Sequence, residues 1–163
     1  MKYTVHEVAK LSGVTIKTLY HYQKVGLLHP DSIANNGYRI YSDRELELLQ
    51  QILFYRELEF PLKKIKIAMQ NEPSRLRCLC DQRALLKVRQ QRMNGILHTL
   101  NEAISYAEKG ENMSKETMFK GLNKQEWEGN FSEQNDHLKN NYGVELNIDS
   151  IDVDVMNDKA NEA

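Results

Sequence analysis

The chain has 163 residues, with 40% hydrophobic and 28% charged side chains and a formal net charge of −1. This length allows one domain with an extension or two small domains, and the absence of an apolar run of about 18 residues excludes a predicted membrane span. The polar N-terminus argues against a signal peptide, and Cys78 and Cys80 are too close for an ordinary disulfide. We therefore expect a cytoplasmic protein.

The net charge conceals an uneven distribution. Residues 1–110 carry an excess of Lys and Arg, whereas residues 111–163 hold 5 Lys and Arg against 12 Asp and Glu. The basic part can approach a polyanion such as DNA, and the acidic part is expected to stay away from it.

The first 26 residues predict two helices joined by a tight turn. Thr4 and Thr15 are candidate N-caps, and Gly13 and Gly26 can take the left-handed conformation that ends a helix. This layout is typical of a DNA-reading helix-turn-helix, whose second helix meets phosphates and base edges in the major groove. The candidate DNA contacts at the start and on the outward face of that helix are Thr15, Lys17, Thr18, Tyr20 and His21.

The next segment predicts a wing. Asn36-Gly37 is a strong hairpin signal, because this pair accepts positive φ at both central positions of a turn. Residues 38–41 follow as a strand, in which we expect Arg39 to contact phosphate. Tyr38 and Tyr41 either contact the DNA backbone as well or pack the wing onto the helices. With the helix pair in front of it, this hairpin predicts a winged helix-turn-helix domain over residues 1–73.

Two further helices complete that domain. Ser42 and Glu45 have the spacing of a capping box, and the apolar pattern predicts a largely buried helix to about Phe60. Pro61 suits the first turn of another helix, whose lysines face either solvent or DNA.

Residues 74–109 predict one long helix of about 50 Å. Its apolar residues form a heptad seam, which favours dimerisation with a second copy of the chain, parallel or antiparallel. The alternative is that the helix packs only on its own C-terminal segment. The candidate dimerisation residues are Leu79, Leu86, Met93, Leu97, Leu100 and Ile104.

Residues 110–163 predict a linker, a helical stretch from Ser114 to Tyr142 and a weakly ordered, partly disordered end. Its aromatic side chains either contact a ligand or form the core of a small helical cap. These side chains are Phe119, Trp127, Phe131 and Tyr142.

No catalytic constellation is evident, so we expect neither an enzyme nor a cofactor. Cys78 and Cys80 lie two positions apart on the long helix and would point about 200° apart, which makes a poor metal chelate. We expect them to be small helix residues and predict no metal site, with metal or redox sensing as the alternative.

Residues 2–108 resemble the MerR family of transcriptional regulators. The motifs that carry the resemblance are YTVHEVAKLSGV at 3–14, TLYHY at 18–22, GLL at 26–28, GYRIYS at 37–42 and LEFPLKKI at 58–65. The resemblance implies a mainly α protein with a winged helix-turn-helix and an antiparallel coiled-coil dimer. It also implies an activator that bends and untwists the promoter spacer so that RNA polymerase engages both promoter elements.

Residue by residue, the resemblance places Lys17, Tyr20 and His21 on the recognition helix. It assigns a phosphate contact to Tyr22 and wing contacts to Tyr38 and Arg39.

Residues 113–143 resemble the start of the effector domain of the TipA-like subgroup, whose domain is all-α and binds thiopeptide-type antibiotics. Residues 110–163 are accordingly expected to be a truncated effector segment. The resemblance implies activation in response to a small hydrophobic or thiopeptide ligand. The alternatives are a ligand-independent repressor or architectural DNA-binding dimer, and a drug-sequestering protein.

Overall fold

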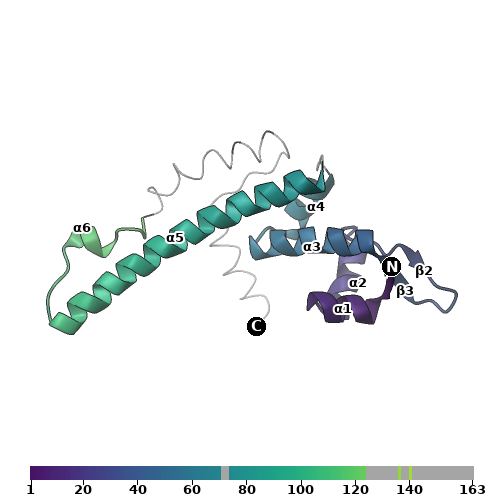
Figure 1. The fold of residues 1–163 in the computed structure, drawn as a ribbon, viewed down its shortest axis with the longest axis horizontal. Helices are drawn as coiled ribbons and strands as arrows, with labels where there is room; N and C mark the ends of the chain where they lie inside the picture. The colour runs from purple at the N-terminus through teal and green to yellow at the C-terminus, as the bar shows by residue number, and fades with distance from the viewer. Residues whose placement is uncertain (71–73, 124–135, 137–139, 141–163) are drawn as a thin grey trace. The chain divides into compact units, whose positions relative to one another are not determined.

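The computed structural model describes residues 1–70, 74–123, 136 and 140 (Figure 1). The chain divides into two compact units, Met1–Cys78 and Leu79–Ala163. The described elements are mainly helical with one small sheet, as the sequence predicts. In the part of the chain that the structure describes, every helix is too short or too polar to span a bilayer.

The first two helices form the predicted helix-turn-helix. They are α1 (Val5–Ser12) and α2 (Ile16–Lys24). The Thr4 hydroxyl accepts the Glu7 backbone N–H at 3.2 Å, and the Thr15 hydroxyl accepts that of Thr18 at 3.0 Å. Each bond satisfies a donor that the first turn of a helix leaves open. Gly13 ends α1 with φ +76°, where a side chain would strain the backbone.

A three-stranded antiparallel sheet flanks these helices. Its strands are β1 (Lys2–Thr4), β2 (Ser32–Ile33) and β3 (Arg39–Ser42), in the order β1-β3-β2. Tyr3 pairs with Tyr41, and Ile33 pairs with Arg39. The sequence predicts only the hairpin, because three residues ahead of a helix cap are too few to show an alternating pattern.

The hairpin turn differs in detail from the predicted Asn-Gly turn. The Gly37 N–H donates to the Ala34 carbonyl at 2.8 Å, and the Ala34 N–H donates to the Tyr38 carbonyl at 2.8 Å. Gly37 has φ +82°, whereas Asn36 keeps a negative φ. The loop therefore has three residues and a single left-handed position, which is a common hairpin solution in its own right.

The core of the first unit is completed by α3 (Asp43–Glu57) and α4 (Leu62–Gln70). The Glu45 carboxylate accepts the Ser42 N–H at 2.8 Å, which closes the predicted capping box. α3 ends three residues before Phe60, since Glu59 turns to φ 65° and the Phe60 N–H bonds back to a carbonyl of α3. The side chains that are fully buried here include Val8, Leu19, Ile52, Tyr55 and Ile65.

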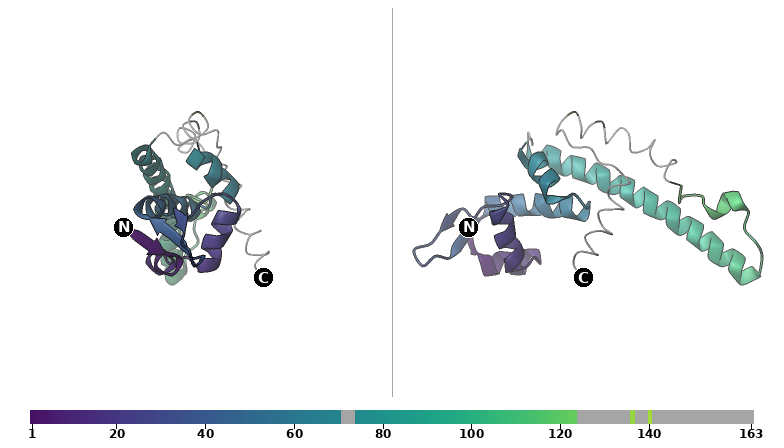
Figure 2. Two further views of the ribbon diagram at one scale, coloured as in Figure 1. Left: turned by 90° about the vertical axis from the view of Figure 1, so that its right-hand side faces the viewer. Right: turned by 180° about the vertical axis from the view of Figure 1, so that it is seen from behind.

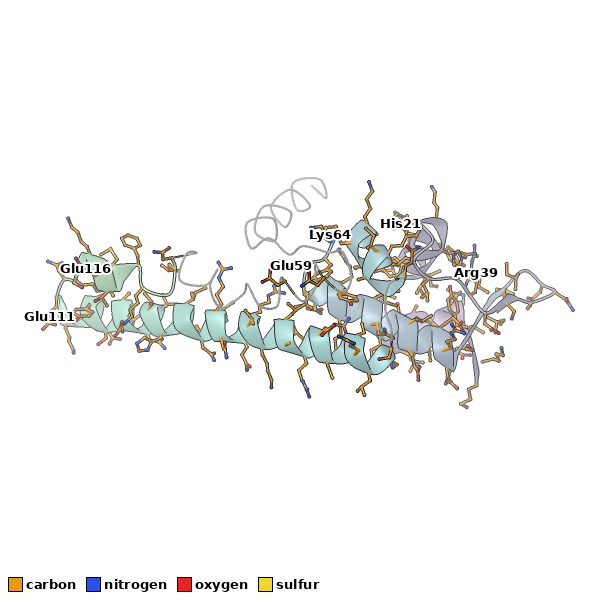
Figure 3. The ribbon with its side chains drawn as sticks, turned by 90° about the horizontal axis from the view of Figure 1, so that it is seen from above. His21, Arg39, Glu59, Lys64, Glu111 and Glu116 are labelled. Carbon is orange, nitrogen blue, oxygen red and sulfur yellow. The ribbon has the colours of Figure 1, made fainter. Side chains whose placement is uncertain are left out.

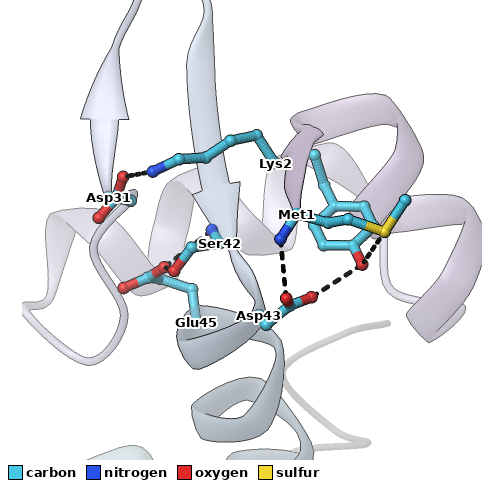
Figure 4. Close-up of polar contacts among 7 residues, drawn as sticks. Met1, Lys2, Asp31, Ser42, Asp43 and Glu45 are labelled. Carbon is cyan, nitrogen blue, oxygen red and sulfur yellow. Dashed lines mark hydrogen bonds and ion pairs between the residues drawn. The ribbon is translucent and has the colours of Figure 1, made fainter.

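The N-terminal strand is tied to the rest of this unit by charged groups (Figure 4). The Met1 ammonium and the Tyr3 hydroxyl both donate to the Asp43 carboxylate at 2.8 Å, and Lys2 pairs with Asp31. Bonds from the ammonium and from Tyr3 lower the pKa of Asp43, while its carboxylate raises the pKa of Tyr3. The first residues of the chain are therefore held at the start of α3.

The long helix α5 (Arg75–Lys109) begins within the first unit. Arg75 donates to the Glu47 carbonyl at 2.7 Å and to the Gln51 side chain at 2.9 Å, both on α3. Buried Cys78 lies 3.3 Å from the Tyr55 hydroxyl, whereas Cys80 is exposed. These contacts join the start of α5 to α3, and the first compact unit accordingly extends to Cys78; the predicted domain boundary at residue 73 stays a prediction.

In the second unit, α5 is followed by the short helix α6 (Lys115–Met118). The predicted helical stretch from Ser114 to Tyr142 begins as expected, with Ser114 as the N-cap, but it is interrupted after Met118, and the chain turns at Gly121 with φ +80°. The Thr99 hydroxyl donates to the Lys120 carbonyl, and a Cβ on Gly121 would lie only 2.9 Å from the Gly95 carbonyl oxygen. The α6 segment thus lies directly against α5, as Figures 1 and 2 both show.

Candidate nucleic-acid interface

One face of α2 consists of exposed polar and aromatic side chains. Lys17, Tyr20, His21 and Lys24 are all exposed, and their spacing of three, four and seven places them on one side of the helix. Leu19 on the opposite side is fully buried and holds the helix to the core. His21 on α2 and Arg39 on β3 are both labelled on the first unit in Figure 3. This face has the chemistry to meet both phosphates and base edges.

The two predicted threonines mark the start of α2 and are already bonded. Their hydroxyl oxygens lie 2.8 Å apart, and Thr15 is exposed while Thr18 is half-buried. Their role in the fold is to fix the beginning of the recognition helix. A DNA contact by either residue stays a prediction.

The wing presents apolar as well as polar groups. Tyr38 is 56% exposed and Ile33 is 61% exposed, although Ile33 is paired in the short ladder between β2 and β3 and Tyr38 directly precedes β3. The hairpin projects away from the helices of its unit in both Figure 1 and the rear view of Figure 2. A projecting strand pair with an exposed ring suits contact with sugar and phosphate at the edge of a groove.

Two tyrosines among the candidate DNA contacts are buried. Tyr41 is 1% exposed and Tyr22 is 5% exposed. Burial raises the pKa of both hydroxyls, against the opposing influence of Arg39 on Tyr41 and of Arg56 on Tyr22. For Tyr41 this favours packing, the alternative open from the sequence. The phosphate contact that the family resemblance implies for Tyr22 stays a prediction.

Arg39 links the wing to the recognition helix. Its guanidinium carbon lies 4.1 Å from the centre of the Tyr20 ring, and its Nε donates to the Gln23 side-chain oxygen. Alternation along β3 places Arg39 and buried Tyr41 on the same face of the strand, toward α2. The arginine predicted as a phosphate contact is thus already engaged with two side chains of α2.

A lysine of α4 caps the C-terminal end of α2. Lys66 Nζ donates to the Val25 carbonyl at 3.2 Å, immediately before Gly26 with φ +75°. A cation at a helix C-terminus interacts favourably with the carbonyl dipoles there. The lysines of α4, expected to face solvent or DNA, therefore include one that holds the recognition helix.

Sequence reasoning missed three residues of this interface. Lys24 could have been found from its spacing of seven from Lys17 on the same helix face. No local signal indicates Gln23 or Lys66, because each depends on a partner that is far away in the sequence.

The apolar seam of the second unit is largely open to solvent. Leu79 and Leu86 are half-buried, whereas the four later members are 47–52% exposed; these are Met93, Leu97, Leu100 and Ile104. Phe119, a predicted ligand contact, is 60% exposed. The other three predicted ligand contacts lie outside the described residues; these are Trp127, Phe131 and Tyr142.

The helix pair, the capped recognition helix and the hairpin define the first unit as a winged helix-turn-helix. A family model described as "MerR HTH family regulatory protein" matches residues 3–72. The crystal structure of the HTH-type transcriptional regulator SkgA from Caulobacter crescentus is 34% identical, with a TM-score of 0.69, and covers 81% of this chain and 96% of that one. The chain belongs to the MerR family.

Curated relatives agree with this assignment. The HTH-type transcriptional activator mta of Bacillus subtilis is 39% identical over 90% of this chain and 57% of its own length. The HTH-type transcriptional activator TipA of Streptomyces coelicolor is 38% identical over 73% of this chain and 47% of its own length. The chain spans about half the length of these curated relatives.

Proposed function

We propose that this protein is a DNA-binding transcriptional activator that acts on a promoter as a homodimer. The observation that carries the proposal is the exposed polar and aromatic face of α2 beside the projecting wing. These exposed residues are not needed for the core of the first unit, which is formed by other, buried side chains. The names of the mta and TipA relatives as transcriptional activators support the same reading.

The dimer is supported by the open seam of α5. Apolar side chains at helical spacing and about half exposed are costly in water, and covering the exposed half of each one contributes about 1 kcal/mol. A second copy of α5, packed antiparallel, would cover them and bring together two winged units. In two-fold dimers, the half-sites on DNA are separated by about one helical turn, or a multiple of it.

Activation is proposed to act through the DNA itself. A dimer that contacts two half-sites can bend and untwist the spacer between two promoter elements, so that RNA polymerase engages both. The segment after α5 is proposed to belong to the TipA-like subgroup and to respond to a small hydrophobic or thiopeptide ligand, with Phe119 as its one described candidate contact.

The test combines binding with transcription. Gel-shift assays on the DNA upstream of the gene, at graded salt concentrations, should show specific binding that weakens steeply as salt rises, because several phosphates are neutralised. In vitro transcription with RNA polymerase, with and without thiopeptides, then measures activation. Specific binding with unchanged or reduced transcription would contradict activation and favour a repressor. The absence of specific binding to any upstream fragment would contradict the proposal as a whole.

A further inference from the structure

A side chain of the wing holds two side chains of the recognition helix. The planar guanidinium of Arg39 lies over the Tyr20 ring at 4.1 Å, and its Nε donates to the Gln23 amide oxygen. Tyr20 and Gln23 are three residues apart and therefore adjacent on the surface of α2. One arginine thus fixes two neighbouring positions on the helix.

The cluster of Arg39, Tyr20 and Gln23 lies next to a buried tyrosine of the core. Buried Tyr41 follows Arg39 by two residues on β3. Burial raises the pKa of its hydroxyl, the Arg39 cation lowers this pKa, and Tyr20 raises it. Within the described residues this hydroxyl has no hydrogen-bond partner, so its contribution here is the packing of its ring. Tyr20 in turn is 41% exposed, which leaves part of its ring open to a ligand.

We propose that Arg39 is a positioning residue, which sets the orientation of Tyr20 and Gln23 and so controls how strongly α2 discriminates between DNA sequences. This inference rests on the proposed DNA-binding function. A ring and an amide that are held before DNA arrives lose less conformational freedom on binding. A contact to phosphate alone would need only a positive charge, whereas this arrangement needs the flat, forked guanidinium.

The difference between Arg and Lys makes the proposal testable. Duplexes would be selected from a random DNA library with the full-length wild-type chain, and affinities for selected and scrambled duplexes measured by fluorescence anisotropy. Arg39→Lys keeps the charge but loses the stack and the Nε bond. We expect it to bind scrambled DNA within about twofold of the wild type but to lose about tenfold or more in preference for the selected sequence.

A double-mutant cycle isolates the coupling between wing and helix. Arg39→Ala, Tyr20→Ala and the double variant should be strongly non-additive on selected DNA, because either single change already releases the cluster. Tyr20→Phe keeps the ring and should retain the coupling. Thermal unfolding of each variant checks that the winged unit remains folded, and Arg39→Lys serves as the conservative variant if Arg39→Ala does not fold.

Lys24→Ala is the matched control. Lys24 is an exposed cation on the same helix without the stack, so its loss should weaken binding to both duplexes alike and reduce the salt dependence. The proposal is overturned if Arg39→Lys keeps full discrimination and Arg39→Ala behaves like Lys24→Ala, since Arg39 would then be a simple phosphate contact. A wild-type chain that selects no sequence overturns the proposed function, and this inference with it.

Discussion

The two units of the chain differ in how far their apolar side chains are buried. The first unit buries its own, with Val8, Leu19 and Ile52 completely inaccessible. The described part of the second unit consists of one long helix with a short return, and its seam residues Leu97 and Leu100 remain about half exposed. The first unit thus buries its own core, whereas the described part of the second unit leaves an apolar seam exposed, which we propose a second copy covers. The difference teaches that burial within a chain can be complete in one segment while the adjacent segment leaves its apolar residues exposed.

The largest expected effect is the loss of the proposed dimer. Replacing Leu97 and Leu100 together by Asp should give monomers at micromolar concentration in analytical ultracentrifugation, because four carboxylates would enter one apolar interface. Gln91→Asp with His98→Asp is the matched control, since these exposed residues lie on the opposite side of α5. A dimer that persists after the first pair of changes would show that the seam is not the interface.

A second comparison uses the same substitution in both units. Ile52→Ala should lower the free energy of unfolding of the first unit by about 2–5 kcal/mol, because Ile52 is fully buried. Ile104→Ala, made in the monomeric variant, should change stability by less than about 0.5 kcal/mol, since Ile104 is 47% exposed. Chemical denaturation followed by circular dichroism measures both. Equal losses would contradict the distinction between a finished core and an open seam.

A smaller effect is expected where α6 meets α5. Gly110→Ala should cost about 1 kcal/mol, because its positive φ strains a side chain although nothing lies within 4 Å. Gly121→Ala should cost more, since its Cβ would also collide with the Gly95 carbonyl oxygen. Hydrogen exchange of the α6 amides, such as Met118, reports the docking. Similar exchange in the two variants would mean that the close approach contributes nothing.

The smallest effect concerns pH. Asp43 has a lowered pKa in the folded state, so it stabilises the first unit above the ordinary carboxylate pKa of about 3.9 and loses this contribution as pH falls through the lower folded value. Asp43→Asn should therefore lower the melting temperature slightly at neutral pH and flatten its decline in acid. An unchanged acid profile would mean that the exposed network around Asp43 is not formed in solution.

The elements that the sequence predicts correctly are governed by local rules. Thr4, Thr15 and Ser42 start helices because a hydroxyl can satisfy an open backbone donor within three residues. Gly13 and Gly26 end helices because they alone accept the left-handed conformation without strain. The recognition helix and its exposed face follow from the same short-range periodicity, and so does the seam of α5.

Two features that the sequence did not show depended on distant partners. The pairing of Tyr3 with Tyr41 creates β1, and the core that forms around it buries Tyr41. The approach of Gly121 to Gly95 accompanies the early end of the predicted C-terminal helix. In each case the deciding contact joins residues more than twenty positions apart, which no local pattern records.

The sequence alone therefore determined the type of protein, the boundaries of the helices up to residue 109 to within a few residues, and the exposed face of α2. Only the tertiary structure decided which of those side chains are exposed and which already contact other side chains. Arg39 shows the reason. Its charge and its place on the wing predict a phosphate contact, but the packing of β3 against α2 brings it onto Tyr20 and Gln23. Caps, turns and periodicity act over a few residues, whereas the environment of a side chain depends on the whole chain.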